Sequence, residues 1–171
     1  SNSDVDFTQY NRIIMIYPEV YPRICSWSGL STLGMNTFET PDGNINASAE
    51  IVTLPHPDTG WTPWYPAQIV GTGLHEFGHG LGVGHANDLE CGNVSVGENC
   101  ESIAYGDYFD IMGSSTLRRE PYSSINREHI GWLNSSQILS VTSGGRYSID
   151  SIASMSSGIK ALKIPSLYGN Y

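Results

Sequence analysis

Short apolar runs separated by turn residues make up most of this chain. Residues 12–17 form an apolar run that ends at Pro18, and this pattern predicts a buried central strand. Residues 25–33 predict a turn followed by a second short strand. Residues 46–54 alternate weakly, with Ala47, Ala49 and Ile51 as the apolar positions, and prolines follow at 55 and 57. Because proline is tolerated mainly at sheet edges, we predict an edge strand here.

Two helices are predicted, with polar loops and short strands around them. The first runs from residue 66 to about residue 81, although glycines at 71, 73 and 78 lie inside it. Each glycine costs about 1 kcal/mol relative to alanine, so packing or a ligand must stabilise this helix. The second is predicted over residues 123–133, whose apolar positions fall near one face. Residues 86–111 are polar and loop-like, and short strands are expected after residue 137.

Residues 75–85 carry the pattern H-E-x-x-H-x-x-G-x-x-H, with His75, Glu76, His79, Gly82 and His85 at its fixed positions. His75 and His79 are four residues apart, so both imidazoles leave one helix face and can share a zinc ion. A continuing helix would carry His85 out of reach, so the helix is expected to end at Gly82, which adopts positive φ readily. Three histidines leave the fourth zinc position to water. Glu76 can take a proton from that water as general base and pass it to the leaving amine.

A structural zinc site is the alternative interpretation of the three histidines. Such sites normally use four protein ligands, often cysteines. No fourth ligand is evident from the sequence, although Asp88 lies close to His85 along the chain. The pattern therefore favours a catalytic zinc with Glu76 as the catalytic residue.

The elongated histidine motif, followed by a methionine turn, resembles the metzincin clan of zinc endopeptidases. The sequence Asp110-Ile111-Met112-Gly113 supplies the turn, and Met112 lies 27 residues after His85. Within the clan the chain is similar to the gametolysin-like family. That similarity rests on residues 10–18, 25–30, the motif with Ala86-Asn87, residues 105–107 and residues 126–133.

The resemblance implies an α+β fold, with a twisted mixed sheet packed on an active-site helix and a smaller, irregular C-terminal subdomain. It implies that Met112 forms an apolar floor beneath the histidines. It also implies an extended protein or peptide substrate that adds to an edge strand, for which residues 46–54 are the candidate. Some metzincins carry a tyrosine two residues after the methionine. Position 114 is serine here, so Tyr105 and Tyr122 are candidate substitutes, with plain packing as the alternative.

The length of the chain limits the number of domains that it can form. With 171 residues we expect one catalytic domain over 1–171. Its N-terminal subdomain would cover about 1–85 and its C-terminal subdomain about 86–171. The part after residue 137 is a candidate start of a truncated β module.

Charge and cysteine content narrow the classes of partner and compartment. Eight Lys and Arg against 17 Asp and Glu give a net charge of −9, which disfavours nucleic acid as a partner. No apolar run approaches the 18 residues of a membrane span. Cys91 and Cys100 are expected to form a disulfide, which suits a secreted, extracellular protein. Cys25 is then a buried free thiol or a former partner of a removed pro-segment or missing domain, and the start at Ser1 suggests a trimmed chain.

Acidic residues, two further histidines and three glycosylation sequons suggest additional features. An acidic group could hold a structural calcium ion, and its members are Asp88, Glu90, Glu101, Asp107 and Asp110. His56 and His129 are expected on the surface or in helix packing. Glycosylation sequons begin at Asn46, Asn93 and Asn134.

Together these features predict a monomeric, secreted, zinc-dependent endopeptidase. One alternative is a catalytically inactive zinc-bearing binding or adhesion module on the same scaffold. Another is a hydrolase of that scaffold that acts on something other than peptides.

Overall fold

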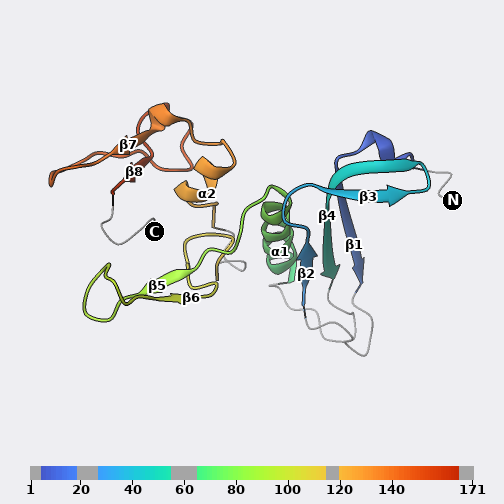
Figure 1. Cartoon of the computed structure of the whole chain (residues 1–171), viewed down its shortest axis with the longest axis horizontal. Helices are drawn as coiled ribbons and strands as arrows, with labels where there is room; N and C mark the ends of the chain where they lie inside the picture. The colour runs from blue at the N-terminus through green and yellow to red at the C-terminus, as the bar shows by residue number, and fades with distance from the viewer. Residues whose placement is uncertain (1–4, 19–26, 55–64, 115–119, 166–171) are drawn as a thin grey trace. The chain divides into compact units, whose positions relative to one another are not determined.

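The computed structural model is a mixed α+β structure with one mixed sheet and few helices (Figure 1), in agreement with the α+β class predicted from the sequence. It describes residues 5–18, 27–54, 65–114 and 120–165, so the predictions for Cys25 and His56 lie outside the described residues. The chain divides into two compact units. The first comprises Ser1–Gly84 with Ser115–Glu120, and the second comprises His85–Ser114 with Pro121–Tyr171. None of the helices in the described ranges has the length and apolar character to cross a membrane.

The first unit is organised around β4 (Gly43–Leu54), which pairs with three other strands. β1 (Arg12–Pro18) runs parallel to it, whereas β2 (Gly29–Ser31) and β3 (Asn36–Thr40) run antiparallel. A short 3-10 helix, η1 (Phe7–Gln9), precedes β1. β3 and β4 form a hairpin in which Thr40 pairs with Gly43 across Pro41-Asp42, residues typical of tight turns.

The strand order β1-β4-β2 shows that two strand predictions were wrong. The apolar run at 12–17 was expected to be central, but β1 lies at the edge of this order and exposes 52% of Ile14 and 61% of Ile16. Residues 46–54 were expected to form an edge strand that receives substrate, but they lie inside β4. Residues 50–52 of β4 pair with β1 and also with β2, which leaves no free edge there. The prolines that suggested an edge follow the last residue of β4, so they do not interrupt its pairing.

Helix α1 (Tyr65–Gly80) packs against β4 and β2, and its bounds agree with the prediction to within one residue at each end. The face of β4 toward α1 carries Ser48, Glu50 and Val52, all buried. A Cβ at Gly73 would lie 4.0 Å from Cγ2 of Val52, and a Cβ at Gly80 would meet Glu50. The close approach of helix and strand therefore requires glycine at position 80, whereas the space at position 73 would accept a methyl group.

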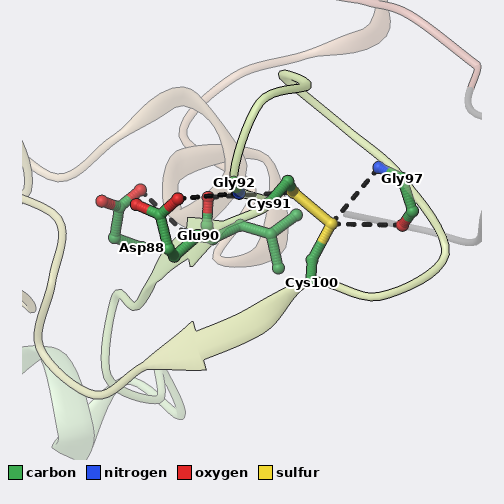
Figure 2. The surroundings of a disulfide bond; sticks show 7 residues. Asp88, Glu90, Cys91, Gly92, Gly97 and Cys100 are labelled. Carbon is green, nitrogen blue, oxygen red and sulfur yellow. Dashed lines mark hydrogen bonds between the residues drawn. A yellow bond between two sulfur atoms is a disulfide. The ribbon is translucent and has the colours of Figure 1, made fainter.

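The second unit begins with a hairpin of β5 (Asp88–Glu90) and β6 (Glu101–Ile103). The predicted disulfide between Cys91 and Cys100 is confirmed, and it closes this hairpin with a Cα–Cα distance of 4.2 Å (Figure 2). β7 (Ile138–Ser140) follows η3 (Ser135–Gln137) and pairs in parallel with β8 (Ala161–Lys163). The buried apolar residues of this unit are Ile111, Met112, Tyr122, Leu133 and Ala161.

Helix α2 (Ser124–His129) is shorter than the predicted span of 123–133. Ser123 is its N-cap, and the Ser123 side chain accepts a hydrogen bond from the Asn126 N–H. The helix ends because Gly131 adopts a φ of 77°. The N–H groups of Gly131 and Trp132 then donate to the carbonyls of Glu128 and Arg127, which is the pattern of a Schellman C-cap.

Candidate metal centre

The C-terminal end of α1 turns the chain sharply after the first two histidines of the motif. Gly82 has a φ of 93°. The Gly82 N–H donates to the His79 carbonyl at 2.8 Å, and the Val83 N–H donates to the Gly78 carbonyl at 3.0 Å. These two bonds form a Schellman motif, in which glycine is preferred at the residue with positive φ. The chain therefore leaves the helix axis three residues before His85.

The two histidines of α1 lie one turn apart on a face that is largely covered. Their ring centroids are 4.8 Å apart with an interplanar angle of 87°. His75 is 6% exposed. Nδ1 of His79 lies 2.8 Å from the Val83 carbonyl oxygen. A carbonyl only accepts, so Nδ1 carries the proton and Nε2 of His79 is left to bind a metal.

His75, His79 and His85 form a group that could hold a metal ion. Each ring offers one nitrogen, and these nitrogens lie within 4.8 Å of one another. Zinc–nitrogen bonds of about 2.0–2.1 Å place the nitrogens of a tetrahedral site about 3.4 Å apart. The rings are therefore within a short side-chain movement of a common ion. An all-imidazole donor set suits zinc, copper, iron or nickel, so the histidines alone do not fix the identity of the metal.

Glu76 follows His75 in α1 and is buried, with 6% of its surface exposed. Its carboxyl group lies against Gly29 of β2, where a Cβ would come within 2.6 Å of Cγ and 2.7 Å of Cδ of Glu76. Burial, and then the negative charge of Glu50, raise the pKa of Glu76 to about 7. Glycine at position 29 is therefore what gives the Glu76 carboxyl group its space.

Glu50 is a second buried carboxyl group near α1, and it was not among the site residues predicted from the sequence. It is 1% exposed. Its Oε1 accepts a hydrogen bond from Ser48 Oγ at 2.8 Å, and Ser48 Oγ accepts one from Nη1 of Arg12 at 3.0 Å. Oε2 has no hydrogen-bond partner within the part of the chain that the structure describes. On a strand with alternating polar and apolar residues, a carboxylate is normally predicted to face solvent. The burial of Glu50 is therefore evident only from the structure, in which α1 packs closely over it.

The methionine turn is buried and linked to the segment after His85. Met112 is fully buried, and its carbonyl accepts a hydrogen bond from the Ala86 N–H at 3.0 Å. Oδ1 of the buried Asp110 accepts from the Met112 N–H. Oδ2 of Asp110 accepts from the Ser123 N–H and from Nδ2 of Asn126. Asp110 thus fixes the turn by hydrogen bonds. From the sequence it was expected only as part of the methionine-turn motif and as a member of a candidate calcium group.

The two tyrosines considered as site residues have different environments. Tyr105 is 43% exposed, and its ring lies on the imidazole of His85 with a centroid distance of 3.9 Å. Tyr122 is buried and packs edge-on against Trp132 at 5.6 Å. Burial, and then the charge of Asp110, raise the pKa of Tyr122 to about 12. Tyr105 thus contacts a residue of the histidine group, His85.

Three acidic residues of the candidate calcium group accept hydrogen bonds from backbone N–H groups one or two residues further along the chain. Oδ1 of Asp88 accepts from the Leu89 N–H, Oε1 of Glu90 accepts from the Gly92 N–H (Figure 2), and Oδ1 of Asp107 accepts from the Phe109 N–H. Across residues 5–18, 27–54, 65–114 and 120–165, His75, His79 and His85 are the only group of three or more His, Cys, Asp or Glu side chains close enough together to hold a metal ion. These residues give no support to a calcium site.

Comparison with known proteins assigns no family to this chain. No family model matches it, and neither a curated protein nor a solved structure is significantly similar to it. Functional inference therefore rests on the residues and their geometry.

Proposed function

We propose that this protein is a secreted zinc-dependent endopeptidase of the metzincin type, similar to the gametolysin-like family. The observation that carries the proposal is the group of His75, His79 and His85, whose ring nitrogens lie within 4.8 Å of one another, together with the buried carboxyl group of Glu76. The motif order and the buried Met112 downstream are features of that clan. The disulfide in the β5–β6 hairpin supports an extracellular location, because disulfides persist in oxidising compartments.

The donor set fits a catalytic zinc site. Three neutral imidazoles are a known catalytic arrangement that leaves one coordination position open, whereas structural zinc sites are usually closed by four protein ligands. When bound, zinc lowers the pKa of water from 15.7 to about 7 and polarises a carbonyl oxygen as a Lewis acid. In this chain the hydrogen bond from Nδ1 of His79 to the Val83 carbonyl would orient one ligand and fix its tautomer.

Glu76 is the proposed general base. Its carboxylate would accept the proton of the attacking water and then donate that proton to the amine nitrogen as the peptide C–N bond breaks. A pKa of about 7, raised by burial and by Glu50, suits a group that must both accept and release a proton near neutral pH. The contact with Gly29 would keep this carboxyl group in one position during the reaction.

The corrected strand order suggests a new candidate for the substrate-binding strand. Among the described strands, β2 lies at the end of the order β1-β4-β2, so one of its edges is not paired with another of these strands. β2 also carries Gly29, which contacts the Glu76 carboxyl group. We therefore propose that an extended peptide adds to β2 rather than to residues 46–54, which brings its backbone next to the general base.

The test is zinc content together with cleavage of a mixed denatured-protein substrate, with and without a chelator. We expect one zinc ion per chain and cleavage that the chelator abolishes. Glu76→Gln keeps the size of the side chain and removes its basicity, so it should retain zinc and lose turnover. Retained turnover in this variant would refute the assignment of Glu76. Zinc binding without any cleavage in the unaltered protein would instead favour the inactive binding module.

A further inference from the structure

Tyr105 has an unfavourable backbone conformation. It is the one non-glycine residue with a positive φ, 57°, in the described part of the chain. It occupies the third position of the turn at residues 103–106, which is closed by a hydrogen bond from the Gly106 N–H to the Ile103 carbonyl at 3.0 Å. A turn with positive φ at its third position normally takes glycine or asparagine. An aromatic side chain there costs free energy, and such costs are concentrated at functional sites.

Several hydrogen bonds hold Tyr105 in this conformation. Its N–H donates to Oδ1 of Asn87 at 3.1 Å, and its carbonyl accepts from Oγ of Ser114 at 2.7 Å. Asn87 lies two residues after His85, and Ser114 lies two residues after Met112. The Ala86 N–H donates to the Met112 carbonyl, so the segment after His85 and the methionine turn are also joined directly. The backbone of Tyr105 is thus fixed between the two segments.

This conformation places the Tyr105 ring on the third histidine of the group. The ring centroids of Tyr105 and His85 are 3.9 Å apart, and the ring planes are inclined by 36°. His85 is the exposed member of the histidine group, whereas His75 is buried and the His79 ring is oriented by its hydrogen bond to Val83. Contact with an aromatic ring whose backbone is held in place restricts the rotation of an exposed imidazole.

We propose that Tyr105 is a positioning residue for His85, whose ring holds the imidazole ready to bind the metal ion. The inference rests on the proposed metal site and extends it to a residue outside the histidine motif. Its physical basis is preorganisation, because a side chain that is already ordered loses less conformational entropy on binding. The proposed interaction is the contact between the two rings, so Tyr105→Phe, which keeps the aromatic ring, should preserve it.

Four variants separate the positioning role from a structural one. Tyr105→Gly and Tyr105→Asn remove the ring but suit the positive φ, so the fold should not be weakened. Tyr105→Phe keeps the ring. Tyr108→Asn is the matched control, because Tyr108 lies in the same loop and is 59% exposed. Zinc affinity is measured by competition with a chelating dye, ligand geometry by the visible spectrum of the cobalt-loaded protein, and thermal stability on the metal-free protein.

We expect Tyr105→Gly and Tyr105→Asn to weaken zinc binding about 10–100-fold, the usual range for a residue that orients a ligand. Their metal-free stability should equal or exceed that of the unaltered protein. Tyr105→Phe and Tyr108→Asn should bind zinc normally, with an unchanged cobalt spectrum. Normal zinc affinity in both Tyr105→Gly and Tyr105→Asn, or a loss in Tyr105→Phe as large as theirs, would overturn the inference.

The same titration distinguishes failure of this inference from failure of the proposed metal site. His85→Ala removes the third candidate ligand. If the unaltered protein binds zinc no better than His85→Ala, the metal site is refuted and the inference with it. If the unaltered protein binds tightly and the Tyr105 variants bind equally well, only the inference is refuted.

Discussion

Gly73 and Gly80 lie in the same helix, yet the same substitution should have opposite effects at the two positions. Replacing glycine by alanine inside a helix normally raises the free energy of unfolding by about 0.5–1 kcal/mol, because alanine loses less backbone entropy on folding. At Gly73 the added methyl group would find its nearest neighbour, Cγ2 of Val52, at 4.0 Å, which is an ordinary contact. We therefore expect Gly73→Ala to stabilise the protein by that amount.

At Gly80 the same methyl group would collide with the carboxyl group of Glu50. It would overlap Oε1 of Glu50 and lie only 3.0 Å from its Cδ and from Oγ of Ser48. Glu50 is 1% exposed and cannot swing into solvent. Overpacking of this kind costs about 1–3 kcal/mol, which exceeds the gain in helix propensity. With a cost of about 2 kcal/mol, the middle of that range, and the propensity gain of about 0.5–1 kcal/mol subtracted, we expect Gly80→Ala to lower the free energy of unfolding by about 1–1.5 kcal/mol.

Urea unfolding followed by circular dichroism measures both effects. The protein is kept metal-free with a chelator, since a bound ion would add its own stabilisation. Glu50→Ala provides the control, because it removes the group with which the new methyl collides. Gly80→Ala should therefore cost at least about 1 kcal/mol less in the Glu50→Ala background. If Gly80→Ala stabilises the protein as Gly73→Ala does, the packing of Glu50 against α1 is not as described.

Three further predictions concern the site and the second unit. Gly29→Ala should lower kcat/KM about 10²-fold with unchanged zinc content, because its methyl group would displace the Glu76 carboxyl group; an unaltered kcat/KM would contradict the contact. Since the pKa of Glu76 is raised from 4.5 to about 7, the folded, metal-free protein holds this proton more tightly than the unfolded chain does. The resulting stabilisation is complete below pH 4.5 and is lost as the pH rises through about 7, so unfolding free energy should fall over that window by up to about 3 kcal/mol. Urea unfolding at several pH values should show a flatter profile for Glu76→Gln, and identical profiles would rule out Glu76 as the source. Replacing Cys91 and Cys100 by serine should lower the unfolding free energy of the second unit by about 2–3 kcal/mol, from the entropy of the short loop; in urea unfolding, a stability equal to that of the disulfide-bonded protein would contradict this.

The sequence was more informative about α1 than about the sheet. The predicted helix is present because motif spacing and a C-terminal glycine act locally, within a few residues. The sheet was misjudged because strand position depends on partners far away in the chain. β1 contains an apolar run but lies at the edge of its sheet, whereas β4 is central although Asn44, Ser48 and Glu50 make it polar. Only the contact with a glycine-bearing helix explains how Ser48 and Glu50 can be buried.

The site shows the same division between local and distant information. The three histidines could be selected from their spacing alone, and the structure brings them close enough to share a metal ion. The contacts of Gly29 and Glu50 with α1 could not be predicted from spacing, because these two residues lie on strands that are distant from α1 along the chain. Tyr105 was considered only as a substitute for a tyrosine two residues after Met112. Its contact with His85 depends on a positive φ at a turn position that favours glycine or asparagine, and the sequence has tyrosine there.

The disulfide across the β5–β6 hairpin determines how a proteolytic cut in the hairpin loop would be detected. Val94 and Val96 are 57% and 42% exposed within the loop between Cys91 and Cys100. Such exposed loop segments are preferred points of proteolytic nicking. A single cut anywhere in residues 92–99 would leave the two fragments covalently attached through the disulfide. The nicked protein would migrate as one species without reductant and as two with it.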